Sequence, residues 1–319
     1  PGALVLKGDN PFSGILYVDI ASTTLDGGLV RLANPNAAGS LTGIQIRNNN
    51  GGFSTLELDG TSGDVTVPAT APVSLAGRGG TVPAFRNIFG NNTLSGAFTI
   101  QSGGGNYCFQ SDAGTLILGG AFTSNAPATA RSLTFQGAGN ITLDGVLSNG
   151  TTTSGVGIVK NGAGTLALNG ANTHTGPMAI NGGTVTLAGS GTRTEAAVSM
   201  AAGATFNINR TIALAAAVSG SGTINNTGSN TITGDFSNFT GSYTHNSAFV
   251  STAFNSTTAT SRNASYNLAS TQGSSQGFIA GASGDQTLEL GALNGVAGSL
   301  FRGGNTATGT TTLRVGNLN

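Results

Sequence analysis

The sequence predicts an all-β protein, a parallel β-solenoid built from coils of about 19–25 residues. Three observations predict this fold. A short phrase rich in Gly, Thr and Leu recurs along the chain, apolar and polar residues alternate within it, and Gly or Asn flanks it. Self-similarity at a period of this size is typical of solenoids. We therefore expect one continuous solenoid over residues 1–319, with its clearest repeat at 159–189.

The repeated phrases set the length of each coil. AGTLILGG, AGNITLDG and AGTLALNG begin at positions 113, 138 and 163, in two equal steps. Farther along, GGTVTLAG, AGATFNIN, SGTINNTG and TGSYTHNS follow each other at shorter steps. Each phrase alternates with the period of a strand that has one buried face. The Ala-rich stretch 210–220 falls inside this period, so we expect strand there rather than helix.

The alternation also predicts the core. Apolar residues two positions apart should point into the solenoid, and each coil should bury those of its neighbour when coils stack about 4.8 Å apart. The expected inward residues are Leu116, Leu118, Ile141, Leu143, Leu166, Leu168, Val185 and Leu187. Outward positions should form ladders of Thr, Ser and Asn. Low charge suits such ladders, because like charges stacked at equivalent positions would repel.

The opening residues repeat the same phrase. GALVLKGDNPFSG, at 2–14, places Gly2, Leu4, Leu6 and Phe12 where the phrase at 162–176 has Gly164, Leu166, Leu168 and His174. In both copies an Asn stands two positions before the ring, and in the later copy it is Asn172. Because the chain begins inside a repeat, we expect both ends to be cut from a longer solenoid.

Composition excludes several classes of function. The 12 basic and 12 acidic residues cancel and form no runs, which argues against nucleic-acid binding. No apolar run reaches the length of a membrane-spanning helix. The single cysteine, Cys108, cannot form an internal disulfide, and between Tyr107 and Phe109 we expect it to be buried.

Residues 159–189, VKNGAGTLALNGANTHTGPMAINGGTVTLAG, resemble the autotransporter-associated β-strand repeat, also called the passenger-associated transport repeat. Two positions depart from that pattern: His174 stands at the usual aromatic position and Met178 at the usual Thr. The resemblance implies a right-handed parallel β-helix, the passenger of an autotransporter-like protein, located outside the cell on a bacterial surface.

Candidate chemistry is sparse, and we predict no catalytic residue, no cofactor and no enzyme activity. Glu57 and Asp59 alternate with leucines in LELDGTSGD, and Asp64 follows, so these three carboxylates are candidates for a calcium site. The alternative, which we favour, is a solvated strand face that ends in a turn. His174 is expected to pack in the core, and His245 stands alone in the sequence.

Two functions remain open from the sequence. The first is a structural surface protein, a stalk, fibre or adhesin, which associates with itself end to end or laterally and meets a glycan or a neighbouring cell. The second is a carbohydrate-binding or carbohydrate-cleaving β-helix, including one like a phage tail spike. Hydrolysis would need two carboxylates across a groove, and the 12 Asp and Glu residues offer few candidates.

Overall fold

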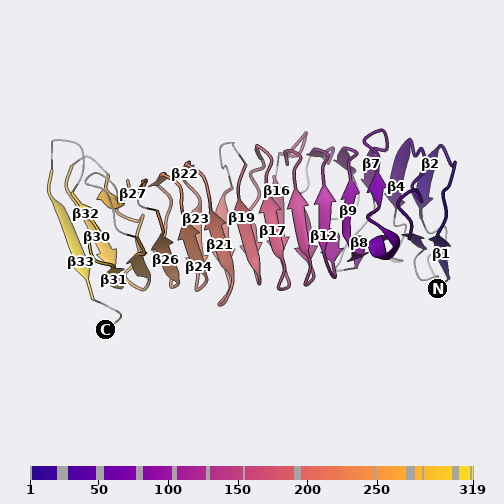
Figure 1. Ribbon diagram of the computed structural model, residues 1–319. Helices are drawn as coiled ribbons and strands as arrows, with labels where there is room; N and C mark the ends of the chain where they lie inside the picture. The colour runs from indigo at the N-terminus through magenta and orange to yellow at the C-terminus, as the bar shows by residue number, and fades with distance from the viewer. Residues whose placement is uncertain are drawn as a thin grey trace. The chain divides into compact units, whose positions relative to one another are not determined.

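The computed structural model describes residues 2–19, 28–47, 54–76, 82–102, 106–126, 130–153, 155–189, 195–247, 249–270, 277–281, 284–303, 309–316 and 318. The chain divides into two compact units, Pro1–Gly176 (unit 1) and Pro177–Asn319 (unit 2). Each unit is a parallel β-solenoid, in which strands of successive coils lie side by side (Figure 1). The predicted fold class is confirmed.

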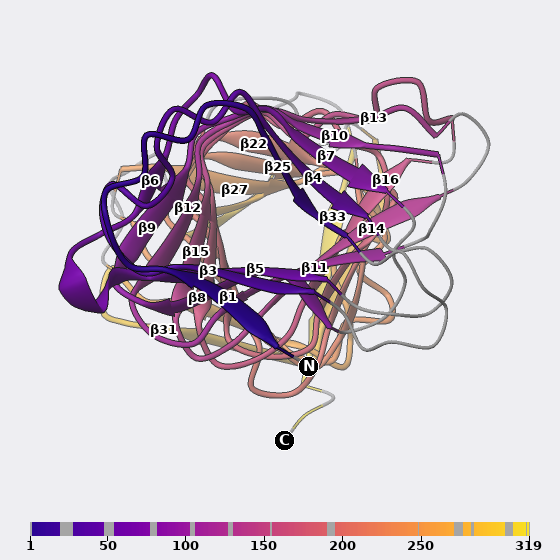
Figure 2. The same ribbon diagram turned by 90° about the vertical axis from the view of Figure 1, so that its right-hand side faces the viewer.

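Unit 1 has strands on three faces, which are seen along the stack in Figure 2. A single turn of 3-10 helix, η1 (Gly60–Ser62), follows one of its strands. The first sheet of unit 1 runs β1 (Ala3–Leu6), β3 (Leu29–Leu32), β5 (Thr55–Asp59), β8 (Pro83–Phe89), β11 (Asn106–Ser111), β14 (Arg131–Gln136) and β16 (Val156–Lys160). The second runs β2 (Ile15–Val18), β4 (Gly43–Arg47), β7 (Val73–Ala76), β10 (Phe98–Ile100) and β13 (Phe122–Ser124). The third runs β6 (Thr66–Val67), β9 (Asn91–Leu94), β12 (Thr115–Leu118), β15 (Asn140–Leu143) and β17 (Thr165–Leu168).

Unit 2 repeats this arrangement, and its first coils are shorter than those of unit 1. One sheet runs β18 (Met178–Ile180), β20 (Ala197–Met200) and β23 (Ala217–Gly220). The next runs β19 (Thr184–Leu187), β21 (Thr205–Ile208), β24 (Thr223–Asn226), β26 (Ser242–His245), β28 (Ser265–Leu268) and β31 (Ala292–Gly295). A third runs β22 (Ile212–Leu214), β25 (Asn230–Ile232), β27 (Ser251–Phe254), β29 (Gly277–Ala280) and β32 (Phe301–Arg302), and β30 (Gln286–Leu290) pairs with β33 (Thr311–Val315). The stretch 210–220 forms the two short strands β22 and β23, as expected.

Register explains why the repeats have the spacing they do. In unit 1 Ile141 pairs with Leu166, whereas in unit 2 Val198 pairs with Val218, which is a shorter step along the sequence. Leu56 pairs with Phe85, and this step along the sequence is longer than the other two because η1 adds length to the corner after β5. Coil length is therefore set by the corners, while the strands keep their alternation.

The core of each unit is a column of apolar side chains between the sheets. All eight inward residues predicted from 116 to 187 are at most 2% exposed. In unit 1 the centre of the column is aromatic, because Phe109 stacks on Phe85 and on Phe135, each with ring centroids 5.6 Å apart. Such stacked and edge-on ring pairs stabilise beyond their buried area.

The opening repeat is packed differently. Leu4 is 56% exposed and Phe12 is 49% exposed, Leu6 is half-buried, and a Cβ on the exposed Gly2 would meet nothing within 4 Å. Strand β1 pairs with β3 alone among the described strands, so one neighbouring coil covers these residues, whereas two coils of unit 1 cover Leu116 on β12. Their sequence pattern is that of a repeat, and their lower burial follows from the single described neighbour of β1.

Glycine occupies positions where two coils touch main chain to main chain. A Cβ on Gly120, Gly145 or Gly170 would collide with the carbonyl oxygen of Gly96, Gly120 or Gly145 respectively, one coil earlier. We call these four residues the glycine column. No side chain fits there, which is one reason why 53 of the 319 residues are Gly.

Candidate functional site

The three carboxylates that the sequence offered as a metal site do different things. On β5 the side chain of Glu57 points to the face opposite that of Leu56 and Leu58, as the alternation requires. It is nevertheless only 2% exposed. It is covered by Arg31 on β3 and Arg86 on β8, which occupy the same register position one coil before and one coil after. Arg31 Nη2 lies 2.7 Å from Glu57 Oε2, and Arg86 Nη1 lies 3.2 Å from Oε1. The expected solvated face is therefore wrong for Glu57.

The ion pairs continue into the next coil. Arg86 Nη2 lies 2.7 Å from Asp112 Oδ2, and Gln110 Nε2 donates to the other Asp112 oxygen at 2.6 Å. The hydrogen bond to Asp112, together with the charges of Asp112 and Glu57, raises the pKa of Arg86, and burial opposes that rise. We call Arg31, Glu57, Arg86 and Asp112 the charge ladder. The sign of the charge alternates along the ladder, so side chains of neighbouring coils attract each other, whereas like charges at these positions would repel.

Asp59 and Asp64 each bind a backbone N–H. Asp59 Oδ1 accepts a hydrogen bond from the backbone N–H of Thr61 at 3.1 Å and so caps η1. Asp64 Oδ1 accepts from the backbone N–H of Asn91 at 2.8 Å. Among the described residues, no three His, Cys, Asp or Glu side chains are grouped so that they could hold a metal ion. The carboxylates that the sequence brought together thus belong to a ladder, to a cap and to a hydrogen bond between coils.

The two histidines are both buried. His174 is 1% exposed. His245, which stands alone in the sequence, has close polar neighbours in the fold: Nδ1 lies 3.1 Å from Thr252 Oγ1 and 3.3 Å from Asn226 Nδ2, and Nε2 lies 3.1 Å from the Val250 carbonyl oxygen. The carbonyl needs a donor, so Nε2 carries the proton and Nδ1 accepts. Burial lowers the pKa of His245, which keeps the ring neutral.

Repeat residues with polar side chains hold the main chain. Asn172, which is 6% exposed, accepts a hydrogen bond from the backbone N–H of Leu147 at 2.7 Å. Asn92 accepts in the same way from Val65 in unit 1, and Asn230 from Ile212 in unit 2. Sequence analysis identified Asn172 only as a member of the repeated phrase. A signal that could have found it is an Asn four positions after a strand: Asn172 follows the end of β17 and Asn230 the end of β24 at this spacing, whereas Asn92 lies within β9.

Lys160 and Cys108 are also part of the interior. The Lys160 ammonium donates to the carbonyl oxygens of Asn161 and Gly162, each at 2.9 Å, and burial lowers its pKa to about 8. Cys108 is 1% exposed between buried Tyr107 and Phe109, as expected. Neither side chain lines a hollow described below.

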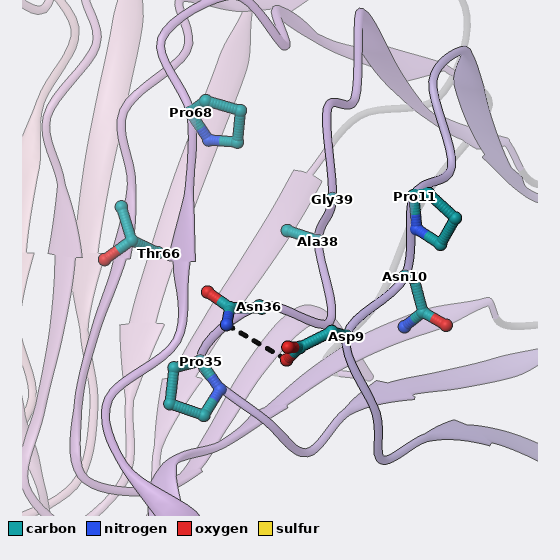
Figure 3. A pocket seen from close by; sticks show the side chains of 9 residues that line it. All are labelled: Asp9, Asn10, Pro11, Pro35, Asn36, Ala38, Gly39, Thr66 and Pro68. Atoms are coloured by element: carbon teal, nitrogen blue, oxygen red, sulfur yellow. Dashed lines mark hydrogen bonds between the residues drawn. The ribbon is translucent and has the colours of Figure 1, made fainter.

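Hollows of about 510 and 480 Å³ are lined by residues of described structure. The first, of about 510 Å³, lies in unit 1 at a corner of successive coils (Figure 3). The rings of Pro11, Pro35 and Pro68 surround it, and Asn36 Nδ2 donates to Asp9 Oδ1 at 2.9 Å inside it. Asp9 is the one carboxylate among its described lining residues. A lone carboxylate gives no acid–base pair for glycoside hydrolysis.

The second hollow, in unit 2, is polar and charged. Its volume is about 480 Å³, and most of its described lining residues carry hydroxyl groups. Arg262 and Arg314 both approach Glu289 Oε1, at 3.0 and 3.4 Å. We call this hollow the Arg262 groove.

Comparison with known proteins gives one result. Residues 158–187 match the family model of the passenger-associated-transport-repeat. The match covers β17, β18 and β19, which lie within the clearest repeat of the sequence pattern, so this chain carries a repeat of the autotransporter-associated type. No curated protein and no solved structure matches the chain. No helix among the described residues is both long enough and apolar enough to cross a membrane.

Proposed function

We propose that this chain is a structural segment of a surface or secreted bacterial protein, the passenger of an autotransporter-like protein that acts as a stalk, fibre or adhesin. The observation that supports this most strongly is the passenger-associated repeat at 158–187 within a parallel β-solenoid. The outward positions add to it. Charged side chains such as Glu57, Arg86 and Asp112 pair with one another between coils and thereby stabilise the stack.

Surface display tests the location. The chain would be fused to an export signal and to a passenger-translocating outer-membrane anchor in a Gram-negative host. We expect an epitope in the exposed 249 region to become accessible to antibody on intact cells, because Phe249 is 87% exposed. A version with residues 158–187 replaced by a Gly/Ser linker of equal length is the control, and it should lose protease resistance. An intracellular passenger that shows no surface epitope would contradict the proposal.

We also propose that the chain has no enzymatic activity. A polysaccharide depolymerisation screen tests this point. In this fold Glu57 and Asp59 have structural partners, and we propose no catalytic role for either. A polysaccharide-cleaving activity that is lost in Glu57→Gln or Asp59→Asn would therefore overturn the proposal.

Self-association is the third part of the proposal. Strand β1 has one described neighbour, β3, and carries the exposed Leu4. Likewise, β33 has one described neighbour, β30, and carries the exposed Val315. Strands with an open edge pair readily with other chains. We propose that a second copy of this chain adds there. Sedimentation velocity over a hundredfold concentration range should show growing species, and Leu4→Lys should reduce them. A monomer at every concentration would refute self-association.

A further inference from the structure

We propose that the Arg262 groove binds the acid groups of an anionic polysaccharide. This inference goes beyond the structural role proposed above and does not depend on it. It begins with the charges. Arg262 and Arg314 contribute two positive charges and Glu289 one negative charge, so the groove's described titratable residues sum to one surplus positive charge.

The two arginines are only partly neutralised. Both guanidinium groups bind the same oxygen, Oε1 of Glu289, and among the described residues each makes that one hydrogen bond. A guanidinium has five N–H donors in a planar fork that fits a carboxylate or sulfate through two bonds. The side chains of Arg262 and Arg314 are 60% and 66% exposed, so their donors can reach a ligand.

The charge ladder of unit 1 also has two arginines beside one glutamate, but there the glutamate is buried. There, Arg31 and Arg86 bind opposite oxygens of Glu57, and Arg86 also binds Asp112. Glu57 is 2% exposed, whereas Glu289 is 32% exposed. Two arginines thus flank a buried carboxylate in unit 1 and a partly exposed carboxylate in unit 2, where the surface keeps a surplus positive charge.

The rest of the groove suits a saccharide. Hydroxyl groups line it, and hydroxyls both donate to and accept from the hydroxyls of sugars. The described residues with such groups are Ser237, Thr257, Thr258, Thr260, Ser261 and Thr287. A smaller hollow of about 200 Å³ shares Arg262, Glu289 and Arg314 and adds Leu290 and Val315. The charged groups thus border both a polar and a partly apolar surface. A chain of sugar rings can contact the first through its hydroxyl groups and the second through its C–H groups.

The floor of the groove is fixed before any ligand arrives. The Ser261 backbone N–H donates to Tyr266 Oη at 2.8 Å, and the Glu289 backbone N–H donates to Thr260 Oγ1 at 3.1 Å. Thr260 and Ser261 are 4% and 2% exposed. A site that is already ordered loses less conformational entropy on binding.

The test uses the purified chain and three polymers: polygalacturonate, which carries carboxylates, dextran sulfate, and neutral dextran. Isothermal titration at low ionic strength should show binding of a polyanion and none of dextran. The double variant R262Q/R314Q should weaken binding at least about tenfold, since it removes both charge-assisted contacts. Arg47→Gln, at an exposed arginine of unit 1, is the matched control and should change the affinity less than twofold. Added salt should weaken binding.

Glu289→Gln separates this proposal from a merely structural role. It removes the internal competitor for both guanidinium groups, so polyanion binding should tighten about two- to fivefold, as expected for one partly exposed charge. Circular dichroism and urea midpoints would confirm that each variant is folded. Binding of either polyanion with these variant effects supports the proposal, and the preferred polymer identifies the acid group. The proposal fails if the chain binds no polyanion, if R262Q/R314Q binds as the unaltered chain does, or if Glu289→Gln weakens binding.

Discussion

Glu57 and Glu289 offer the same substitution in two environments. Each carboxylate lies between two arginines, but the Glu57 side chain is 2% exposed and the Glu289 side chain 32%. Glu→Gln keeps the shape and removes the charge. We expect Glu57→Gln to lower the free energy of unfolding clearly more than Glu289→Gln does.

The magnitude follows from burial. Breaking a fully buried ion pair costs about 3–5 kcal/mol. Arg31 and Arg86 are 35% and 39% exposed, so water compensates part of their loss. We expect about 2 kcal/mol for Glu57→Gln, between the buried and exposed limits. For Glu289→Gln, exposed pairs on both sides give about 0.5 kcal/mol.

Urea unfolding followed by far-ultraviolet circular dichroism measures both changes. A double-mutant cycle of Glu57→Gln with Arg31→Gln should give a coupling energy of about 1 kcal/mol or more, because the two residues share two contacts. If Glu57→Gln destabilises no more than Glu289→Gln, or the coupling is zero, the charge ladder does not stabilise the fold and our reasoning about burial is wrong.

Three further predictions concern the interior. Phe109→Ala should cost about 3–5 kcal/mol of unfolding free energy in urea titrations, because it opens a cavity in the aromatic column; the control Phe89→Ala, at a 54% exposed ring, should stay within about 0.5 kcal/mol. Asn172→Ala should lower the free energy of unfolding by about 1–3 kcal/mol, because it leaves the buried Leu147 N–H without its acceptor. Asn169→Ala, at an exposed residue, should lower it much less, and equal losses would contradict the role of Asn172 in holding the main chain. Burial holds the pKa of His245 below 6.5, so its contribution to stability is complete above pH 6.5 and is lost as the pH falls through the lowered value; unfolding titrations from pH 7 to pH 5 should show this loss, and a His245→Gln variant with an unchanged pH profile would contradict it.

Sequence period predicted most of the fold. Alternation within AGTLALNG is enough to place Leu166 and Leu168 in the core, because any stacked neighbour buries them. Local patterns suffice where a residue's environment is the same in every coil. They fail for Leu4 and Phe12, whose burial depends on how many coils lie beside them.

The sites could not be predicted in the same way. The step along the sequence from Arg31 to Glu57 is shorter than the step from Glu57 to Arg86, so the charge ladder has no fixed period in the sequence. Its register depends on the length of each corner, including the extra turn of η1. His245 likewise meets Asn226 only because β24 and β26 pair in register. Contacts between unequal coils become visible only when the strands are aligned in space.

The glycine column has a consequence for how such a protein changes over generations. Gly170 meets Gly145 as Gly145 meets Gly120, at equal steps along the sequence. If the segment between two of these glycines were lost, the new junction would again bring one glycine against another. Recombination between tandem DNA copies deletes or duplicates such whole segments. We therefore expect natural relatives of this chain to differ in number of coils more readily than in the shape of any one coil, so that length is the heritable trait that selection adjusts.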